Sequence, residues 1–344
     1  MGYGVDIAVV GSGPAGSTIA ALLANRGFDV LILEDGAVGP QRATEVLSPP
    51  CVRAISDWLP PGMLLAPEVA RVCSGIESRW STPAIHLERF EPAPAFLVDR
   101  AALDRRLLEA AKAAGARMAH GHRIREVRSA SGHITLLGTH EGGLWSVDAR
   151  FVVDATGRAS RVARQLGVAR HHFLRQVASV GHARTARTPD RGNWFQVERS
   201  RVGWWTATPT AASGWELVFY RPALAPKPPP QALARLFRST HLARQAGEYE
   251  AGPRHAGLDA GFSALERVQG HRWVAIGDAA VAFDPVSSQG LWHAIGSARA
   301  AAGAVDSYLA KDDVRSLTEY EFRSSATLRH HAGQLRRHYE EKMP

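Results

Sequence analysis

The sequence predicts an α/β protein that combines a Rossmann-like parallel sheet with a separate antiparallel sheet. A short β-branched run, residues 5–10, leads through a glycine-rich turn into an apolar helix. Similar buried-type runs recur at residues 30–33, 151–154 and 273–276. Between residues 177 and 220, in contrast, four alternating runs are separated by turn-forming Gly and Pro, which is typical of antiparallel strands.

The turn after the first strand has the spacing GxGxxG. The first glycine permits a tight turn, the second lets the backbone approach a pyrophosphate, and the third lets the helix lie close to the strand. Backbone amides at the start of the helix then face the phosphates. The turn consists of Gly11, Ser12, Gly13, Pro14, Ala15 and Gly16.

An acidic residue, Glu34, ends the second strand. It follows the turn by about 20 residues, where a carboxylate accepts a hydrogen bond from a ribose hydroxyl. A 2′-phosphate would favour arginine at this place. A glycine-rich loop without a ligand is the alternative, but the strand, helix and acid around it favour a dinucleotide site. The motif alone does not separate NAD from FAD.

Two later segments help to decide between NAD and FAD. Residues 151–154 (FVVD) are followed by ATGR, and residues 273–276 (WVAI) by GDAAVAFDPVSSQG and a long helix. Together with GSGPAG and LVDRAALDRRLLEAA, this order resembles FAD-dependent enzymes of the p-hydroxybenzoate hydroxylase fold. That family includes aromatic hydroxylases, flavin-dependent halogenases and geranylgeranyl reductases. The resemblance covers nearly the whole chain and implies FAD as the cofactor.

The resemblance also implies which residues bind FAD. Gly277 and Asp278 would hold the ribityl and pyrophosphate region, and Arg100 matches a family arginine near the cofactor. For Arg100 the alternative is a solvated side chain beside a helix cap at Asp99. A helix N-terminus favours the anionic edge of reduced flavin. The loop lining the isoalloxazine would contain Pro285, Ser288, Gln289 and Gly290.

On this reading the FAD-binding domain is discontinuous. This domain consists of a parallel sheet with a β-meander. A substrate domain with an antiparallel sheet is inserted into it, and helices end the chain. We expect the FAD-binding domain at 1–80, 98–165 and 265–310, the substrate domain at 81–97 and 166–264, and a C-terminal helix at 311–344.

The composition argues against several other classes of protein. The net charge of +8 comes from scattered arginines and only four lysines, without a basic run, so we expect no nucleic-acid partner. No apolar stretch is long enough to span a membrane, and the N-terminus lacks a secretory pattern. Cys51 and Cys73 form no metal-ligand pattern. These features predict a cytoplasmic protein without a metal site.

The resemblance is closest to flavoprotein hydroxylases that act on tryptophan while maturing protein-derived quinone cofactors. It rests on TEVLSPP at residues 44–50, the SSQG loop and the tail HYEEKMP. It implies an FAD-dependent monooxygenase that hydroxylates an indole- or phenol-like group of a small molecule or partner protein through a flavin hydroperoxide. A separate flavin reductase or NAD(P)H would supply electrons.

Three alternatives stay open. The first is a reductase or dehydrogenase of the geranylgeranyl-reductase type. The second is a flavin-dependent halogenase, which is disfavoured because none of the four lysines lies at a matching position. The third is a non-catalytic, flavin-binding maturation chaperone.

The catalytic candidates are His293, Trp205 and Glu45. His293 follows the flavin loop by one helical turn, Trp205 lies on a strand of the substrate domain, and Glu45 lies where the family's second segment approaches the flavin. Each has a structural alternative: a packed histidine, a core tryptophan and a solvated loop acid. The sequence specifies neither the substrate nor the oligomeric state.

Overall fold

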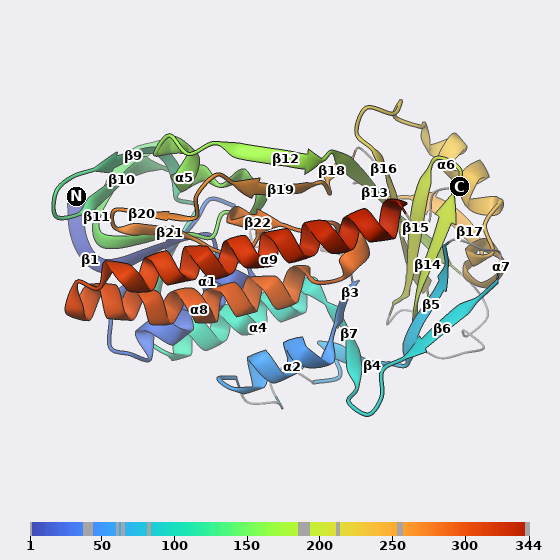
Figure 1. The fold of residues 1–344 in the computed structure, drawn as a ribbon, viewed down its shortest axis with the longest axis horizontal. Coiled ribbons are helices and arrows are strands. Elements are labelled where there is room, and N and C mark those ends of the chain that lie inside the picture. Colours follow the sequence, from blue (N-terminus) through green and yellow to red (C-terminus); the bar gives the residue numbers. More distant parts are fainter. Residues whose placement is uncertain are drawn as a thin grey trace.

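The computed structural model describes residues 2–36, 44–59, 62, 66–80, 84–184, 193–210, 214–252 and 257–340. The last four residues, part of the tail used in the resemblance, lie outside this range. A parallel and an antiparallel sheet occupy opposite ends of the molecule. Helix α9 (Val314–Glu340) runs from one toward the other (Figure 1).

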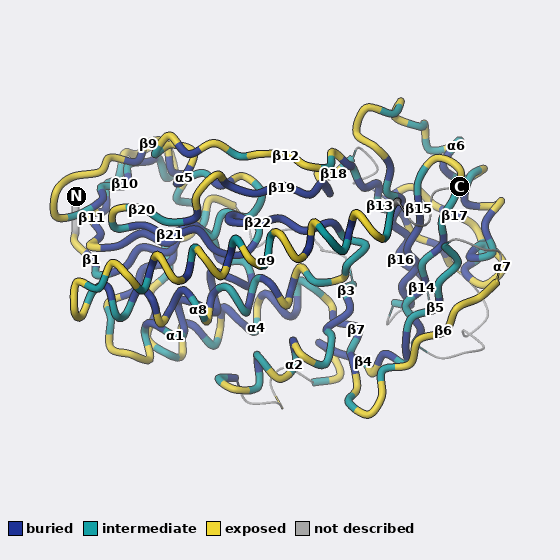
Figure 2. Tube along the Cα trace, viewed as in Figure 1, coloured by how far each residue is buried: buried dark blue, intermediate teal, exposed yellow. Residues whose placement is uncertain are grey.

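The parallel sheet has the order β20-β21-β11-β1-β2-β8, and the strands β9 and β10 form an antiparallel meander with β11. Its central strands are apolar and buried because helices cover them (Figure 2). The predicted α/β fold is therefore confirmed. Its strands are β1 (Gly2–Val10), β2 (Val30–Glu34), β8 (Arg117–His120), β9 (Arg123–Ser129), β10 (Ile134–His140), β11 (Gly143–Asp154), β20 (Gln269–Gly270) and β21 (Trp273–Ala275).

The helices that pack against this sheet come from distant parts of the chain. Helix α1 contacts both α4 and α8, and α9 covers α8. Tyr320 of α9 donates its hydroxyl to the carbonyl of Ala275 on β21 at 2.8 Å. In the described part of the chain, no helix is long and apolar enough to cross a membrane. The bounds are α1 (Pro14–Ala24), α4 (Arg100–Ala113), α5 (Arg161–Gln165) and α8 (Gly290–Lys311).

The second large sheet, which we call the wall sheet, has the order β17-β13-β16-β15-β14-β5-β6 and is antiparallel except where β14 runs parallel to β5. The short helices α6 (Pro230–Arg238) and α7 (Leu242–Ala246) cover one face of it. The other face, the cavity face, points toward the glycine turn. Its strands are β5 (Gly75–Arg79), β6 (His86–Arg89), β13 (Gln176–Arg184), β14 (Trp194–Ser200), β15 (Gly203–Pro209), β16 (Gly214–Pro222) and β17 (Glu248–Ala251), with β18 (Leu258–Asp259) beside β13.

Two three-stranded sheets lie between the large ones, ordered β12-β19-β22 and β3-β7-β4. Strand pairing also shifts the expected domain limits. Residues 75–79, expected in the FAD-binding domain, form β5, which pairs with β14 of the wall sheet. Residues 95–99, expected in the substrate domain, pair instead with β3 and β4. The bounds are β3 (Thr44–Leu47), β4 (Ala70–Cys73), β7 (Ala95–Asp99), β12 (Arg170–Leu174), β19 (Phe262–Leu265), β22 (Val281–Ala282) and helix α2 (Pro49–Ser56).

A buried carboxylate organises the end of β11. Asp154 accepts hydrogen bonds from the amide of Thr156 at 3.1 Å, from its hydroxyl at 2.6 Å and from the amide of Ala163 at 2.9 Å. Burial raises the pKa of Asp154, although these donors oppose the shift. The carboxylate therefore ties the ATGR turn to helix α5.

We expect Asp154→Ala to lower the free energy of unfolding by about 2–3 kcal/mol, because it leaves buried donors unpaired. Urea denaturation measures the change. Asp148→Ala on the same strand removes an exposed carboxylate and is the control, with an expected cost under about 1 kcal/mol. Equal losses for both variants would contradict the assigned role of Asp154.

Candidate active site

A single cavity of about 540 Å³ extends from the glycine turn to the cavity face of the wall sheet. Its nucleotide end lies at the carboxyl ends of the parallel strands, where α/β sheets bind ligands. This end is bordered by Gly11, Gly13, Glu34, Asp35, Thr156, Arg158, Arg161 and Asp278. The wall end is bordered by Phe195, Thr206, Thr208, Glu216, Val218 and Tyr220.

The three glycines of the turn have different surroundings. Gly11 has φ of +106°, and a Cβ there would lie 2.3 Å from the carbonyl oxygen of Ala155. A Cβ at Gly16 would lie 2.0 Å from the carbonyl oxygen of Gly11. At Gly13, in contrast, a Cβ would meet no atom within 4 Å. Gly11 and Gly16 are thus required by backbone packing, whereas the open space at Gly13 fits a pyrophosphate.

Glu34 borders the cavity and also shapes the turn. Its Oε2 accepts hydrogen bonds from the amide of Ser12 at 2.8 Å and from the Ser12 hydroxyl at 2.7 Å. Ser12 itself does not line the cavity. The ribose contact of Glu34 stays a prediction, and its bond to the turn is a role that the sequence did not indicate.

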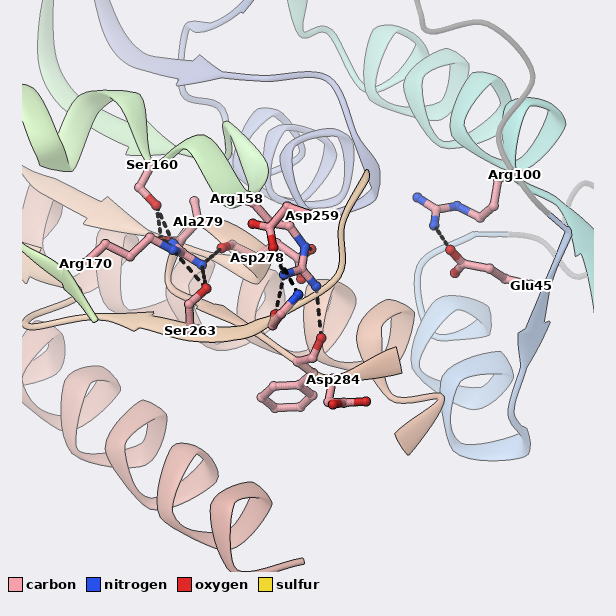
Figure 3. A network of polar contacts seen from close by, with 12 residues as sticks. Glu45, Arg100, Arg158, Ser160, Arg170, Asp259, Ser263, Asp278, Ala279 and Asp284 are labelled. Atoms are coloured by element: carbon pink, nitrogen blue, oxygen red, sulfur yellow. Dashed lines mark hydrogen bonds and ion pairs between the residues drawn. The ribbon is translucent and has the colours of Figure 1, made fainter. Parts of the chain in front are cut away.

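Asp278 lies in a network of arginines (Figure 3). Its carboxylate lies 3.5 Å from Nε of Arg158, and its carbonyl accepts a hydrogen bond from Arg170 at 2.9 Å. Arg158 also donates to the carbonyls of Gly261 and Phe283. Arg158 therefore links Asp278 to the segment returning from the wall sheet. Its place in the ATGR motif was the available sequence signal.

The residues of the loop before α8 border two different hollows. Pro285, Ser288 and Gly290 line the cavity, whereas Gln289 borders a second, more open hollow. Helix α8 begins at Gly290 without a side-chain cap, so its first amides are available to an anionic ligand. Gly277 lies behind the cavity, where a Cβ would approach that of Ala15 to 3.0 Å.

Arg100 and Glu45 form an ion pair at the cavity (Figure 3), with 2.5 Å between Nη1 and Oε1. Asp104 lies 3.4 Å from the Nε of Arg100. Burial opposes the charge of Arg100, but the two carboxylates raise its pKa above the ordinary value. Asp99 caps α4 by accepting from the amide of Ala102 at 2.7 Å. The helix cap at Asp99 is therefore present, but Arg100 is largely buried and is not a solvated side chain.

Two catalytic candidates lie away from the cavity. Leu291 and Ala294 of α8 line it, whereas His293 does not, and its ring lies 4.5 Å from that of Phe283, which does line it. Burial lowers the pKa of His293 to about 4. Trp205 has no exposed surface and packs against Phe237 under α6. Neither side chain borders the cavity, so the geometry gives no support to a catalytic role for either residue, and both roles stay predictions.

Glu216 was missed by the sequence analysis. It is 8% exposed, lies on the cavity face of β16, and accepts a hydrogen bond from the amide of Thr44 at 3.1 Å. Burial raises its pKa to about 7, and the negative charges of Glu45 and Asp99 add to the shift. The available signal was a lone acid in the run WELVFY.

Among the described residues, no group of His, Cys, Asp and Glu side chains is clustered so that it could hold a metal ion.

Comparisons with known proteins identify the cofactor as FAD. The model of the FAD binding domain family matches residues 4–329. The putative FAD-dependent oxidoreductase LodB of Marinomonas mediterranea is 27% identical over 329 residues, covering 85% of this chain and 82% of LodB. The menaquinone reductase of Mycobacterium tuberculosis is 29% identical over 325 residues, covering 88% and 76%. The flavin-dependent brominase Bmp2 shares the fold, with a TM-score of 0.83 at 22% identity, covering 94% and 84%.

Gly13→Val tests the open space in the turn. Because a side chain there would occupy the cavity without meeting protein atoms, we expect FAD affinity to fall at least about tenfold while the thermal midpoint of the FAD-free protein stays unchanged. Fluorescence titration with FAD measures the affinity. Normal FAD binding by the variant would show that the diphosphate lies elsewhere.

Asp278→Ala tests the carboxylate that borders the cavity. We expect FAD affinity to fall at least about tenfold with the fold retained. Asp259→Ala is the matched control, since Asp259 also lies near Arg158, at 3.7 Å, but does not line the cavity. If both variants lost FAD equally, the effect would come from Arg158 and not from a contact of Asp278.

Proposed function

Since this chain belongs to the FAD-binding domain family, we propose that it is an FAD-dependent monooxygenase that hydroxylates an electron-rich aromatic ring. The ring is of the indole or phenol kind and belongs to a small molecule or a partner protein. The observation that carries the proposal is the single cavity that connects the glycine turn to an aromatic wall. A separate reductase or NAD(P)H supplies the electrons.

The nucleotide end fits the cofactor. The amides at the start of α1, above Gly13, would hold the diphosphate. Asp278 and the first amides of α8 would hold the ribityl chain and the edge of the flavin ring. When bound, the flavin supplies redox chemistry with molecular oxygen.

The wall end fits an aromatic substrate. Phe195, Val218 and Tyr220 offer apolar and aromatic surface to a planar ring. Thr206, Thr208 and Glu216 offer hydroxyl and carboxyl oxygens that orient its polar substituent. Because these side chains lie on a largely buried sheet face, a bound ring displaces water from the reacting region.

Halogenation is less well supported despite the similarity to a brominase. No lysine borders the cavity among the residues that the structure describes. The described lysines Lys112, Lys227 and Lys311 lie at the end of α4, before α6 and at the end of α8. None is placed to take part in chemistry at the wall end.

Reduction of a double bond or quinone is the second candidate. It is favoured by the 29% identity to a menaquinone reductase over 325 residues. The same cavity would then hold a flat acceptor against the wall sheet. A non-catalytic flavin-binding chaperone is the third reading, and it predicts partner binding without turnover.

The decisive experiment incubates the FAD-loaded protein with a reductant, isotopically labelled dioxygen and a panel of phenols and indoles. We expect oxygen consumption and a product heavier by one labelled oxygen atom. A product heavier by two hydrogen atoms and free of label would establish the reductase. Absence of turnover with any ring, together with tight partner binding, would favour the chaperone.

Val218→Trp tests where the ring binds. It fills the wall end, so we expect product formation to fall at least about tenfold, or about 1.4 kcal/mol, while FAD stays bound. Val202→Trp, in the exposed turn between β14 and β15, is the control. Unchanged turnover in Val218→Trp would place the substrate outside this cavity.

A further inference from the structure

The wall end of the cavity is unusually acidic. Glu216 lies on the cavity face of β16, and Glu45 of β3 and Asp99 at the end of β7 lie close enough to raise its pKa. Among the described arginines near them, Arg100 already pairs with Glu45 and Asp104, and Arg71 donates to a backbone carbonyl. Negative groups therefore outnumber positive ones where the substrate ring would lie.

The strands around Glu216 contribute polar and charged groups. Strand β3 contributes the Thr44 amide, which donates to Glu216 at 3.1 Å. Strand β15 places Thr208 directly opposite, and β13 places the exposed His182 on the other side. From β4, Arg71 donates to the carbonyl of Pro209 at 2.6 Å.

No ion pair to Glu216 forms among the residues that the structure describes; its hydrogen bond comes from a neutral amide. A buried carboxyl without a cation remains protonated to higher pH, and a positive ligand placed beside it restores the charged form. Within the part of the chain that the structure describes, the partner missing beside this carboxyl is thus a cation.

We propose that the substrate is an aromatic amine whose ammonium group binds the carboxylate of Glu216. This rests on the proposed function, because it takes the wall end as the place where the aromatic substrate binds. A neutral phenol would gain only a hydrogen bond there. An aromatic acid would face Glu216, Glu45 and Asp99, and the cavity-lining Arg100 is already paired with two carboxylates.

The pH dependence follows from the same arrangement. With its pKa at about 7, Glu216 is mostly protonated at about pH 6 and mostly ionised at about pH 8, whereas an alkyl ammonium keeps its charge throughout this range. An ammonium ligand therefore binds more tightly as the pH rises. Ionisation of one group over this interval changes the affinity by about tenfold.

The test measures equilibrium binding to the oxidised, FAD-loaded protein through the change in flavin absorbance, without turnover. The probes are tyramine, para-ethylphenol and para-hydroxyphenylpropionate, which share a phenol ring and differ in charge. We expect tyramine to bind at least about tenfold more tightly than para-ethylphenol, and the acid to bind most weakly. Tyramine affinity should rise about tenfold from about pH 6 to about pH 8.

Three variants assign the effect to Glu216. In Glu216→Gln we expect tyramine to bind no better than para-ethylphenol and the pH dependence to disappear. Glu216→Asp keeps the charge and should keep both. His182→Ala removes the neighbouring histidine on β13 and should also keep both. Flavin content and the thermal midpoint verify that each variant is folded.

Equal binding of the three probes, tighter binding of the acid, no binding of any probe, or a preference for tyramine that persists in Glu216→Gln would overturn the proposal. Its failure is distinguishable from that of the proposed function. Hydroxylation of neutral or acidic rings without charge preference would refute only the proposal that the substrate is an amine. The proposed monooxygenase activity would stand. Glu216-dependent binding of tyramine without oxygen insertion would refute the monooxygenase and leave the charge assignment in place.

Discussion

The site depends on the close approach of three backbone turns at one edge of the parallel sheet. Hydrogen bonds join them in sequence: the amide of Gly11 donates to Leu33, that of Ala155 to Val10, and that of Ile276 to Asp154. Side chains would hold these turns apart, which is why glycine occupies the contact points. The edge thereby presents helix N-termini and open space to a single ligand.

Charge is distributed unevenly along the resulting cavity. Arg158 and Arg161 border the nucleotide end, each paired with an aspartate, and the free amides of α1 add partial positive charge. At the wall end, Arg100 is outnumbered by acids. A dinucleotide with two phosphates suits the first end, and a ring without negative charge suits the second. Membership of the FAD-binding family accounts for the cofactor, and the wall sheet lines the end of the cavity where we propose that the substrate binds.

The sequence indicated those parts of the site that depend on residues close together in the chain. Gly11, Gly13 and Gly16 act within one turn, so their spacing alone indicates their roles. Asp278, in the turn after β21, was likewise named, and it does border the cavity. His293 and Trp205 do not border the cavity, because one residue along a strand turns a side chain to the opposite face and one residue along a helix turns it by about 100°. Sequence proximity to a functional loop does not determine that direction.

By itself, then, the sequence determined the α/β class, the glycine turn and the FAD-binding signature, since these depend on residues close together in the chain. Only the tertiary structure decided that Glu216 faces the cofactor cavity, that Glu45 pairs with Arg100, and that Arg158 bridges to the returning segment. These contacts join residues as many as 172 positions apart. Their chemistry arises from burial and from neighbours that no local pattern records.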